Sequence, residues 1–312
     1  MTSVGALLPR DLPASEILDF ARRAERLGFD ELWVVEDLGF RGGIAQAAAV
    51  LAATERIRVG LGILPAAARN VAFAAMEIAS LEELFPGRVD VGIGHGMPHW
   101  MRQVGVWPAS PLTLLEEYFV ALRALLAGES VSVEGRYVRL RDFGLTERAD
   151  AVPRLLAGVR GPKSLQLAGR VADGVILAEP VTPEYLGAAR ESTGGGYVVA
   201  FAVAAVDADA EAARAAVRPG LAAIGEPDWA PHITPLPFAA EFADLRAQCA
   251  DGAEFAQRMP AAWVDQLAVV GTAADASGRI AQLHAAGADS VVLLPAGRDP
   301  HAALEALAGV LP

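Results

Sequence analysis

The chain has 312 residues, 53% of them hydrophobic, and its 38 acidic residues outnumber its 26 basic ones, which gives a formal net charge of −12. Without a basic block, such a chain is a poor candidate for binding nucleic acid. No apolar run reaches the roughly 20 residues that span a bilayer, and the N-terminus lacks the basic start of a signal peptide. We therefore expect a cytoplasmic protein with no membrane or nucleic-acid partner.

The first half of the chain alternates predicted strands and helices. Apolar runs that do not alternate cleanly with polar residues are typical of buried parallel strands, and they occur at residues 4–8, 31–35, 57–63 and 89–93. Amphipathic helices follow these runs, with predicted starts at Ser15, Gly43, Asn70 and Ser110-Pro111. The only cysteine, Cys249, excludes an intrachain disulfide and a cysteine-based zinc site, and we expect it to be buried.

The second half repeats the alternation with two interruptions. Strands are predicted at residues 154–158, 174–178, 197–206 and 290–294, and helices at 163–171, 183–189, 208–217, after Thr272 and at 301–310. A small hairpin over residues 131–140 follows the fourth helix. Residues 220–260 begin with a proline-rich stretch and continue into a helical segment at 238–255, and we interpret them as an insertion over the active-site end.

Eight strand–helix units over about 300 residues predict a (β/α)₈ TIM barrel formed by a single domain, residues 1–312. A doubly wound sheet is the rival fold, but it would rarely hold eight units at such even spacing. In a barrel, functional groups lie at the carboxyl ends of the strands. That rule selects Glu36-Asp37, Gly62-Ile63-Leu64, His95-Gly96-Met97, residues 158–163 and Ala178-Glu179.

The segment from Phe85 to Trp107 contains the most distinctive of these strand ends. Its strand stops on Gly94-His95-Gly96, where two glycines let the backbone approach a ligand closely. An imidazole at such a place is either a catalytic group or a hydrogen-bonded structural one. No pair of histidine and carboxylate residues has the spacing of a metal site, so we expect no metal.

The loop Gly158-Val159-Arg160-Gly161-Pro162-Lys163 has the features of an anion site. Its glycines allow backbone N–H groups to point into the loop, and the helix that follows offers its positive N-terminal end. Arg160 adds a planar fork for phosphate oxygens and Lys163 a point charge. An ordinary exposed basic loop is the alternative, and a phosphorylated cofactor at one side of the mouth is the functional reading.

Together the motifs resemble the bacterial-luciferase-like superfamily, in the branch that depends on coenzyme F420, a deazaflavin. The resembling stretches lie at residues 24–33, 57–62, 84–96, 158–163, 172–177 and 287–294, in the same order. The resemblance implies a TIM barrel with a flavin or deazaflavin ring in its mouth, hydride transfer at that ring and often a homodimer.

The resemblance also assigns residues. It places Asp37 near the ring, a bulge with a non-proline cis peptide at Gly62–Ile63 under one face of it, and Leu61 beside that bulge. It places His95, Gly96, Met97 and Ala178 around the cofactor and the 158–163 loop at its phosphate. In the sugar-phosphate-oxidising members, the position after Asp37 is a histidine and that of Met97 a glutamate. Here the first is Leu38, so we expect a different substrate.

Three functions remain open from the sequence. The first is an F420-dependent oxidoreductase acting on a small organic substrate, with His95 and Asp37 as candidate catalytic residues. The second is an FMN-dependent monooxygenase of the same superfamily, which would need a flavin reductase partner. The third is a non-catalytic flavin-binding barrel, which the loss of the histidine and glutamate side chains at Leu38 and Met97 keeps open.

Overall fold

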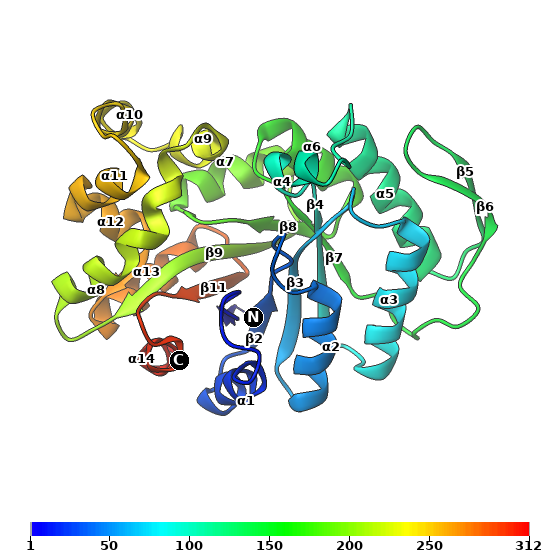
Figure 1. Ribbon diagram of the computed structural model, residues 1–312, viewed down its shortest axis with the longest axis horizontal. Coiled ribbons are helices and arrows are strands. Elements are labelled where there is room, and N and C mark those ends of the chain that lie inside the picture. Colours follow the sequence, from blue (N-terminus) through cyan, green and yellow to red (C-terminus); the bar gives the residue numbers. More distant parts are fainter. Residues whose placement is uncertain (1, 312) are drawn as a thin grey trace.

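In a computed structural model that describes residues 2–311, eight parallel strands close into a barrel (Figure 1). The barrel strands are β1 Ser3–Leu7, β2 Glu31–Val34, β3 Arg58–Pro65, β4 Val89–Gly94, β7 Arg154–Gly158, β8 Gly174–Leu177, β9 Tyr197–Val206 and β11 Ser290–Pro295. Pairing of β11 with β1 and of β8 with β9 closes the ring. The predicted (β/α)₈ barrel is confirmed.

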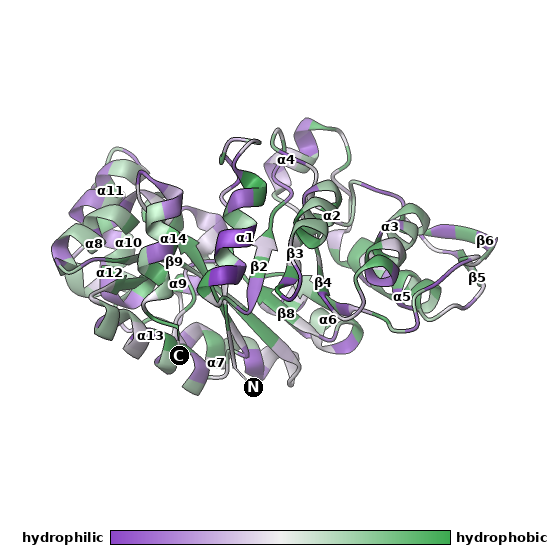
Figure 2. Ribbon diagram, turned by 90° about the horizontal axis from the view of Figure 1, so that it is seen from below, coloured by the Kyte–Doolittle hydropathy of each residue, from purple (hydrophilic) through white to green (hydrophobic). Residues whose placement is uncertain are grey.

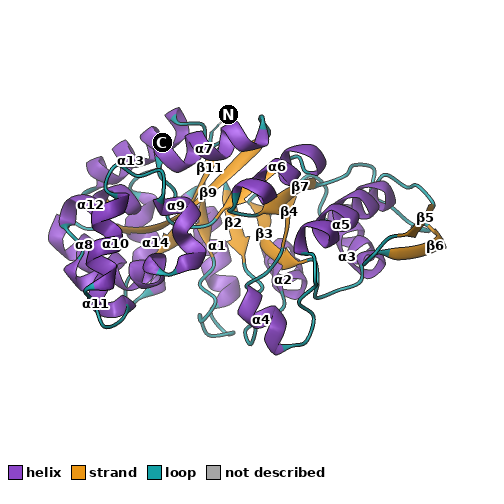
Figure 3. Ribbon diagram, turned by 90° about the horizontal axis from the view of Figure 1, so that it is seen from above, coloured by secondary structure: helices purple, strands orange, loops and turns teal. Residues whose placement is uncertain are grey.

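Helices surround the strands, as Figure 3 shows from above. They are α1 Ile17–Leu27, α2 Gly43–Ala53, α3 Val71–Leu84, α5 Pro111–Leu126, α6 Pro162–Val171, α7 Pro183–Thr193, α8 Ala210–Val217, α13 Ala273–Ala285 and α14 Pro300–Ala308. Asn70 and Thr272 cap α3 and α13 with their side chains, as predicted. No helix within residues 2–311 is long and apolar enough to cross a membrane.

Two predicted helix starts need correction. Ser15 does not cap α1, because the preceding turn, closed by the Glu16 N–H on the Pro13 carbonyl at 2.9 Å, delays the helix and leaves Glu16 at its N-cap. Ser110 does occupy the N-cap of α5 with Pro111 behind it, but its hydroxyl lies 2.8 Å from the Thr113 hydroxyl and makes no cap hydrogen bond. The proline, rather than the serine, therefore defines this start.

The core has two layers. Leucine, valine and alanine side chains fill the space between the strands and the helices, and a smaller cluster that includes Trp33, Leu156, Ile176 and Phe201 fills the barrel itself. In Figure 2, α2 and β8 are largely hydrophobic, whereas α1 is banded because only one of its faces is buried. Because side chains fill the interior of the barrel, we expect a ligand to bind over this packed interior, at the carboxyl ends of the strands.

Two short elements lie outside the strand–helix repeat. The predicted hairpin is present as β5 Val131–Glu134 and β6 Arg139–Phe143, at the edge of the molecule far from the barrel centre (Figure 1). A six-residue helix, α4 Pro98–Gln103, follows β4 on the upper side in Figure 1. Periodicity could not reveal it, because six residues make fewer than two turns.

The insertion between β9 and β11 is larger than predicted. It contains η1 Arg218–Gly225, η2 Pro227–Trp229, α9 Ala230–Ile233, α10 Ala239–Ala247, α11 Gly252–Arg258, α12 Ala261–Leu267 and a further parallel strand, β10 Val269–Gly271. The single helical segment expected at 238–255 is wrong. Asp251 caps a new helix by accepting from the Glu254 N–H at 2.8 Å, which separates α11 from α10. Cys249 is buried between the two, as expected.

Candidate active site at the barrel mouth

The third strand ends in a bulge that forms the floor of the mouth. The register between β3 and β4 shifts between Leu61 and Leu64. The Gly62–Ile63 peptide bond within this bulge is cis, as the resemblance predicted. Leu61 itself is 1% exposed and belongs to the layer beneath the helices, so it supports the bulge from behind.

Three glycines receive the Ile63 side chain. An added Cβ would lie 2.8 Å from Ile63 at Gly94 and 2.9 Å from it at Gly92, and at Gly158 it would overlap Ile63 Cγ2. Real Cβ atoms do not approach so closely, so the ends of β4 and β7 accept this isoleucine only because they carry glycine. The result is an apolar floor in which Ile63 is closely packed against the ends of two strands.

Asp37 lies at the end of β2 and is paired with a residue that the sequence did not single out. Arg10, which follows β1, donates to its carboxylate at 2.5 Å. The neighbouring Glu36 pairs instead with Arg69, whose two terminal nitrogens lie 2.8 and 3.1 Å from its oxygens. Both carboxylates at this strand end are therefore held by arginines.

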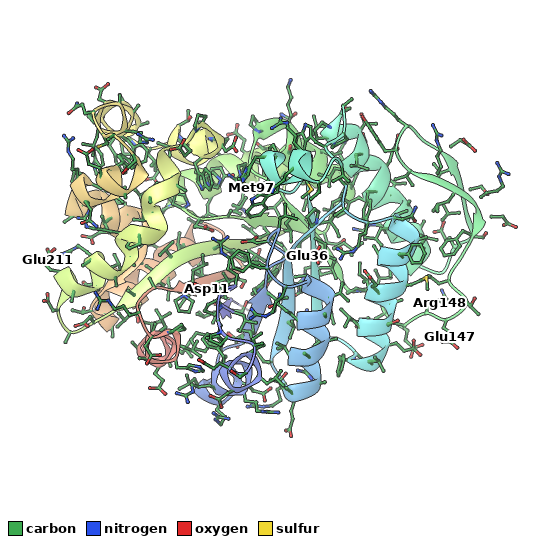
Figure 4. The ribbon with its side chains drawn as sticks, viewed as in Figure 1. Asp11, Glu36, Met97, Glu147, Arg148 and Glu211 are labelled. Atoms are coloured by element: carbon green, nitrogen blue, oxygen red, sulfur yellow. The ribbon has the colours of Figure 1, made fainter. Side chains whose placement is uncertain are left out.

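His95 lies half-buried at the end of β4. Its Nε2 is 3.1 Å from the Ser164 hydroxyl in the first turn of α6, and burial lowers the pKa of its imidazole, which keeps the ring neutral at pH 7. Gly96 follows with φ +70°, and Met97 takes the N-cap position of α4. Figure 4 labels Met97 and Glu36, both near the middle of the molecule.

The loop after β7 leads directly into α6. Gly161 is the N-cap of this helix and Pro162 its first residue, with no side-chain cap, so the N–H groups of the first turn stay available to an anion. Lys163 lies exposed in that turn, whereas Val159 is buried under the helix layer. The loop thus leads into a helix start without a side-chain cap, and its role as a phosphate site stays a prediction.

Arg160 extends toward the insertion. Its guanidinium lies 4.8 Å from the centre of the Trp229 ring, and Nη1 donates to the Asp228 carbonyl at 3.3 Å. The Tyr185 hydroxyl donates to the Arg160 carbonyl at 2.9 Å. The arginine thus joins the strand end to the insertion and keeps further N–H donors for a ligand.

The strand end at Ala178 is fixed by the same insertion. The Trp229 indole donates to the Glu179 carbonyl at 3.0 Å, and His232 Nδ1 lies 3.0 Å from the Pro180 carbonyl. The Glu179–Pro180 bond is cis. Burial raises the pKa of the Glu179 carboxyl, with Asp37 adding to this effect and Arg160 and Arg10 opposing it.

The sequence therefore located the strand ends but not their partners. Arg10, Ser164, Trp229 and His232 come from elsewhere in the chain, and only three-dimensional contact reveals them. The rule that functional groups lie at strand ends did select Glu179, but it gave no reason to prefer Glu179 over the other residues selected. Within residues 2–311, no group of three or more histidine, cysteine, aspartate or glutamate side chains is arranged to hold a metal ion.

The protein is a TIM barrel with an apolar floor in its mouth and a helix start beside it that could bind an anion. These features are typical of TIM-barrel enzymes that bind a ligand at the carboxyl ends of their strands. The family model of luciferase-like monooxygenases matches residues 2–290. The chain belongs to this family.

Known proteins similar to the chain include two curated relatives. The 5,10-methylenetetrahydromethanopterin reductase of Methanolobus tindarius is 30% identical over 301 residues, 91% of each chain. The F420-dependent glucose-6-phosphate dehydrogenase of Microbacterium testaceum is 33% identical over 182 residues, 54% of each chain. The solved coenzyme F420-dependent tetrahydromethanopterin reductase from Methanopyrus kandleri has the same fold, with a TM-score of 0.82, 22% identity and coverage of 98% of this chain and 97% of that one.

Proposed function

We infer that the protein is an oxidoreductase that uses coenzyme F420 and exchanges a hydride with a small organic substrate. The observation that carries this is the floor of the mouth, where Ile63 is seated over Gly92, Gly94 and Gly158. A rigid apolar floor beside a helix start fits a flat ring with a phosphate-bearing tail. The two curated relatives are named as a reductase and as an F420-dependent dehydrogenase, and hydride transfer is the chemistry that such a ring would supply when bound.

Several residues would hold the cofactor. Gly62 and Ile63 support one face of the ring, His95, Gly96, Met97 and Ala178 lie around it, and the loop from Gly158 to Lys163 receives the phosphate. Asp37 lies at the rim, where Arg10 donates to its carboxylate. In this arrangement the buried, neutral imidazole of His95 donates or accepts a hydrogen bond without carrying charge.

Lys163 supports the proposal by its position in the first turn of α6. It is the only lysine of the chain, against 25 arginines. A compact ammonium at a helix start complements a phosphate as a point charge. The Lys163→Ala change should weaken F420 binding by about 1–3 kcal/mol, the scale of a charged hydrogen bond, and the loss should shrink as salt screens the charge.

Because only one lysine exists, amine-selective labelling tests the same contact directly. Besides the N-terminal amine, the reagent can modify only Lys163. Bound F420 should protect this residue, as measured by mass spectrometry of the labelled peptide. Equal labelling with and without F420, together with unchanged affinity of Lys163→Ala, would place the phosphate elsewhere.

An FMN-dependent monooxygenase is the second candidate, favoured by the description of the matching family. The helix start of α6 suits the phosphate of either cofactor. Parallel titrations with F420 and FMN separate the two readings: tight binding of F420 alone supports the first, and tight binding of FMN with oxygen-dependent turnover supports the second. A bound ring that turns over no enone, imine, alcohol or ketone would favour the non-catalytic barrel.

We further propose that the protein forms a homodimer through α3 and α5. Phe73, Met76 and Leu84 on α3 are 65%, 49% and 69% exposed, and Val120 on α5 is 59% exposed. The two helices pack side by side, so these side chains form an apolar patch of the type that is often covered by another protein chain.

We place the protein in the cytoplasm, since a single cysteine requires no oxidising compartment.

The dimer is tested by light scattering after gel filtration. Phe73→Glu should convert the protein to a monomer, because a charge in an apolar interface is costly. Leu18→Glu on α1 provides the control, since Leu18, 36% exposed, lies on a helix that bears no other exposed large hydrophobic side chain. A wild-type protein that elutes as a monomer would contradict the proposal.

A further inference from the structure

Three carboxylates stand at the ends of β2 and β8, and only one of them lacks a partner. Glu36 is held by Arg69 and Asp37 by Arg10. The Glu179 carboxyl makes no ion pair within residues 2–311, and the hydrogen bond it accepts comes from its own backbone N–H. It is therefore the one acid at these strand ends that is free to exchange a proton with a ligand.

Charges on three other strand ends reach this carboxyl. Arg160 after β7, Asp37 after β2 and Arg10 after β1 all act on it. In the barrel order, β2 and β8 lie on opposite sides of the ring. Both residues follow the carboxyl ends of their strands, so Glu179 and Asp37 lie at the same end of the barrel on opposite sides of the mouth.

The insertion holds the backbone of Glu179 in place. Trp229 donates to its carbonyl at 3.0 Å, and His232, which is fully buried, lies 3.0 Å from the next carbonyl, that of Pro180. The His232 ring also packs on Tyr185 at 4.2 Å. Fixed backbone on both sides of an otherwise unpaired acid is the arrangement expected of a positioned acid–base group.

We propose that the Glu179 carboxyl is the acid–base residue of the mouth, which gives a proton to, or takes one from, the heteroatom of a C=O or C=N substrate. The proposal rests on the proposed F420 chemistry. Its raised pKa keeps the carboxyl protonated to higher pH than exposed acids, mainly because the partly buried site desolvates the charged form. A neutral carboxylic acid is the form that donates.

The proton and electron balance closes with one residue. In the reducing direction, a hydride carries two electrons to the substrate carbon, and the Glu179 O–H breaks as its proton forms the new O–H or N–H bond. The carboxylate that remains regains a proton from solvent. In the oxidising direction, the carboxylate removes the hydroxyl or amine proton as the hydride leaves, and the oxidised cofactor would take the hydride with its two electrons.

The test compares Glu179→Gln with Glu191→Gln, an exposed glutamate of α7 with the same substitution. Burial also raises the pKa of the Glu82 carboxyl. Infrared titration of the cofactor-free protein should therefore show two carboxyls, those of Glu82 and Glu179, that stay protonated above the range of the exposed acids in the wild type and in Glu191→Gln. One of these two signals should be missing from Glu179→Gln, and persistence of both would assign the titration to other residues and overturn the proposal.

A second readout places the carboxyl beside the ring. The fluorescence of bound F420 should change with pH in step with the carboxyl titration in the wild type but not in Glu179→Gln, while both proteins bind F420 with similar affinity. Failure of the wild type to bind F420 contradicts the proposed function and leaves the infrared assignment intact. Binding with identical pH profiles in both proteins contradicts the role of Glu179 alone.

Turnover provides the third readout, with reduced F420 and a set of simple ketones and cyclic imines. Glu179→Gln should lose about 10²–10⁴-fold in kcat, the usual contribution of a general acid, with KM little changed. Ketone reduction by the wild type should fall as pH rises through the carboxyl pKa, and this limb should vanish in the variant. Glu179→Asp should recover part of the rate. A kcat within about threefold of wild type would overturn the proposal.

Discussion

The two sides of the barrel mouth are held in different ways. On the β3, β4 and β7 side, the floor is fixed by steric fit, since Ile63 fills a recess that exists because Gly92, Gly94 and Gly158 have no side chains. On the β8 side, two side chains of the insertion, Trp229 and His232, bind backbone carbonyls about 50 residues earlier in the chain.

This difference between steric packing and hydrogen bonding distinguishes the part of the mouth that the barrel strands form from the part that the insertion forms. The steric side uses residues within three neighbouring strands and provides a surface for a flat ring. The hydrogen-bonded side positions Glu179 and carries the insertion. A change on the first side should therefore damage the fold and cofactor binding together, whereas a change on the second should act mainly on the β8 loop and its chemistry.

The largest effect should come from Gly158→Ala. The added Cβ would overlap Ile63 Cγ2, so either the isoleucine or the strand end must shift. Overpacking of this kind costs up to about 3 kcal/mol, measured as a lower urea midpoint, and F420 affinity should fall with it.

Gly161→Ala serves as the matched control for stability. It lies three residues later, and an added Cβ there meets no atom within 4 Å. Its unfolding free energy should stay within about 0.5 kcal/mol of wild type. Equal stability of the two variants would mean that Ile63 is not confined by the glycine recess.

Sequence reasoning predicted the first side better than the second. Gly92, Gly94 and Gly158 stand at regular places in apolar strands, and the strand-end rule needs only local pattern. The contacts of Trp229 and His232 join segments far apart in sequence, and no periodicity encodes them. The fold could be predicted because the strand–helix pattern repeats along the chain. The contacts of Trp229 and His232 with the loop after β8, here called the clamp, could not be predicted, because each of them occurs once.

His232 should make the second side sensitive to acid. The ring is fully buried, and desolvation, reinforced by Arg160, lowers its pKa to about 3. In the unfolded chain the imidazole protonates below about pH 6.5, whereas in the folded protein it stays neutral. The contribution of the neutral His232 ring to the free energy of unfolding is therefore fully present above pH 6.5. Below that pH it falls by about 1.4 kcal/mol per pH unit, toward pH 3.

Urea midpoints at several pH values test this against His232→Gln, which cannot take up the proton. The stability advantage of the wild type should shrink by about 2 kcal/mol between pH 6.5 and pH 5. His284→Gln controls for the loss of one imidazole, since His284 Nδ1 also lies near a carbonyl, that of Ala288 at 2.8 Å, but is only partly buried. A gap between wild type and His232→Gln that stays constant with pH would show that the ring is accessible to protons.

The smallest effect should come from Trp229→Phe, which separates the hydrogen bond of the clamp from its aromatic contact. Phenylalanine keeps a ring under the Arg160 guanidinium but loses the N–H that the Glu179 carbonyl accepts at 3.0 Å. One neutral hydrogen bond contributes about 0.5–1.5 kcal/mol, so the urea midpoint should fall slightly and without the pH dependence of His232.

Trp263→Phe is the matched control for this change. Trp263 lies in the same insertion and stacks on Phe238 at 4.8 Å, and its indole N–H donates to no residue within 2–311. If the hydrogen bond positions Glu179, Trp229→Phe should lower kcat several-fold while Trp263→Phe leaves it unchanged. Equal kcat in both variants would mean that the β8 loop holds its carboxyl without the indole, and that His232 alone secures this side of the mouth.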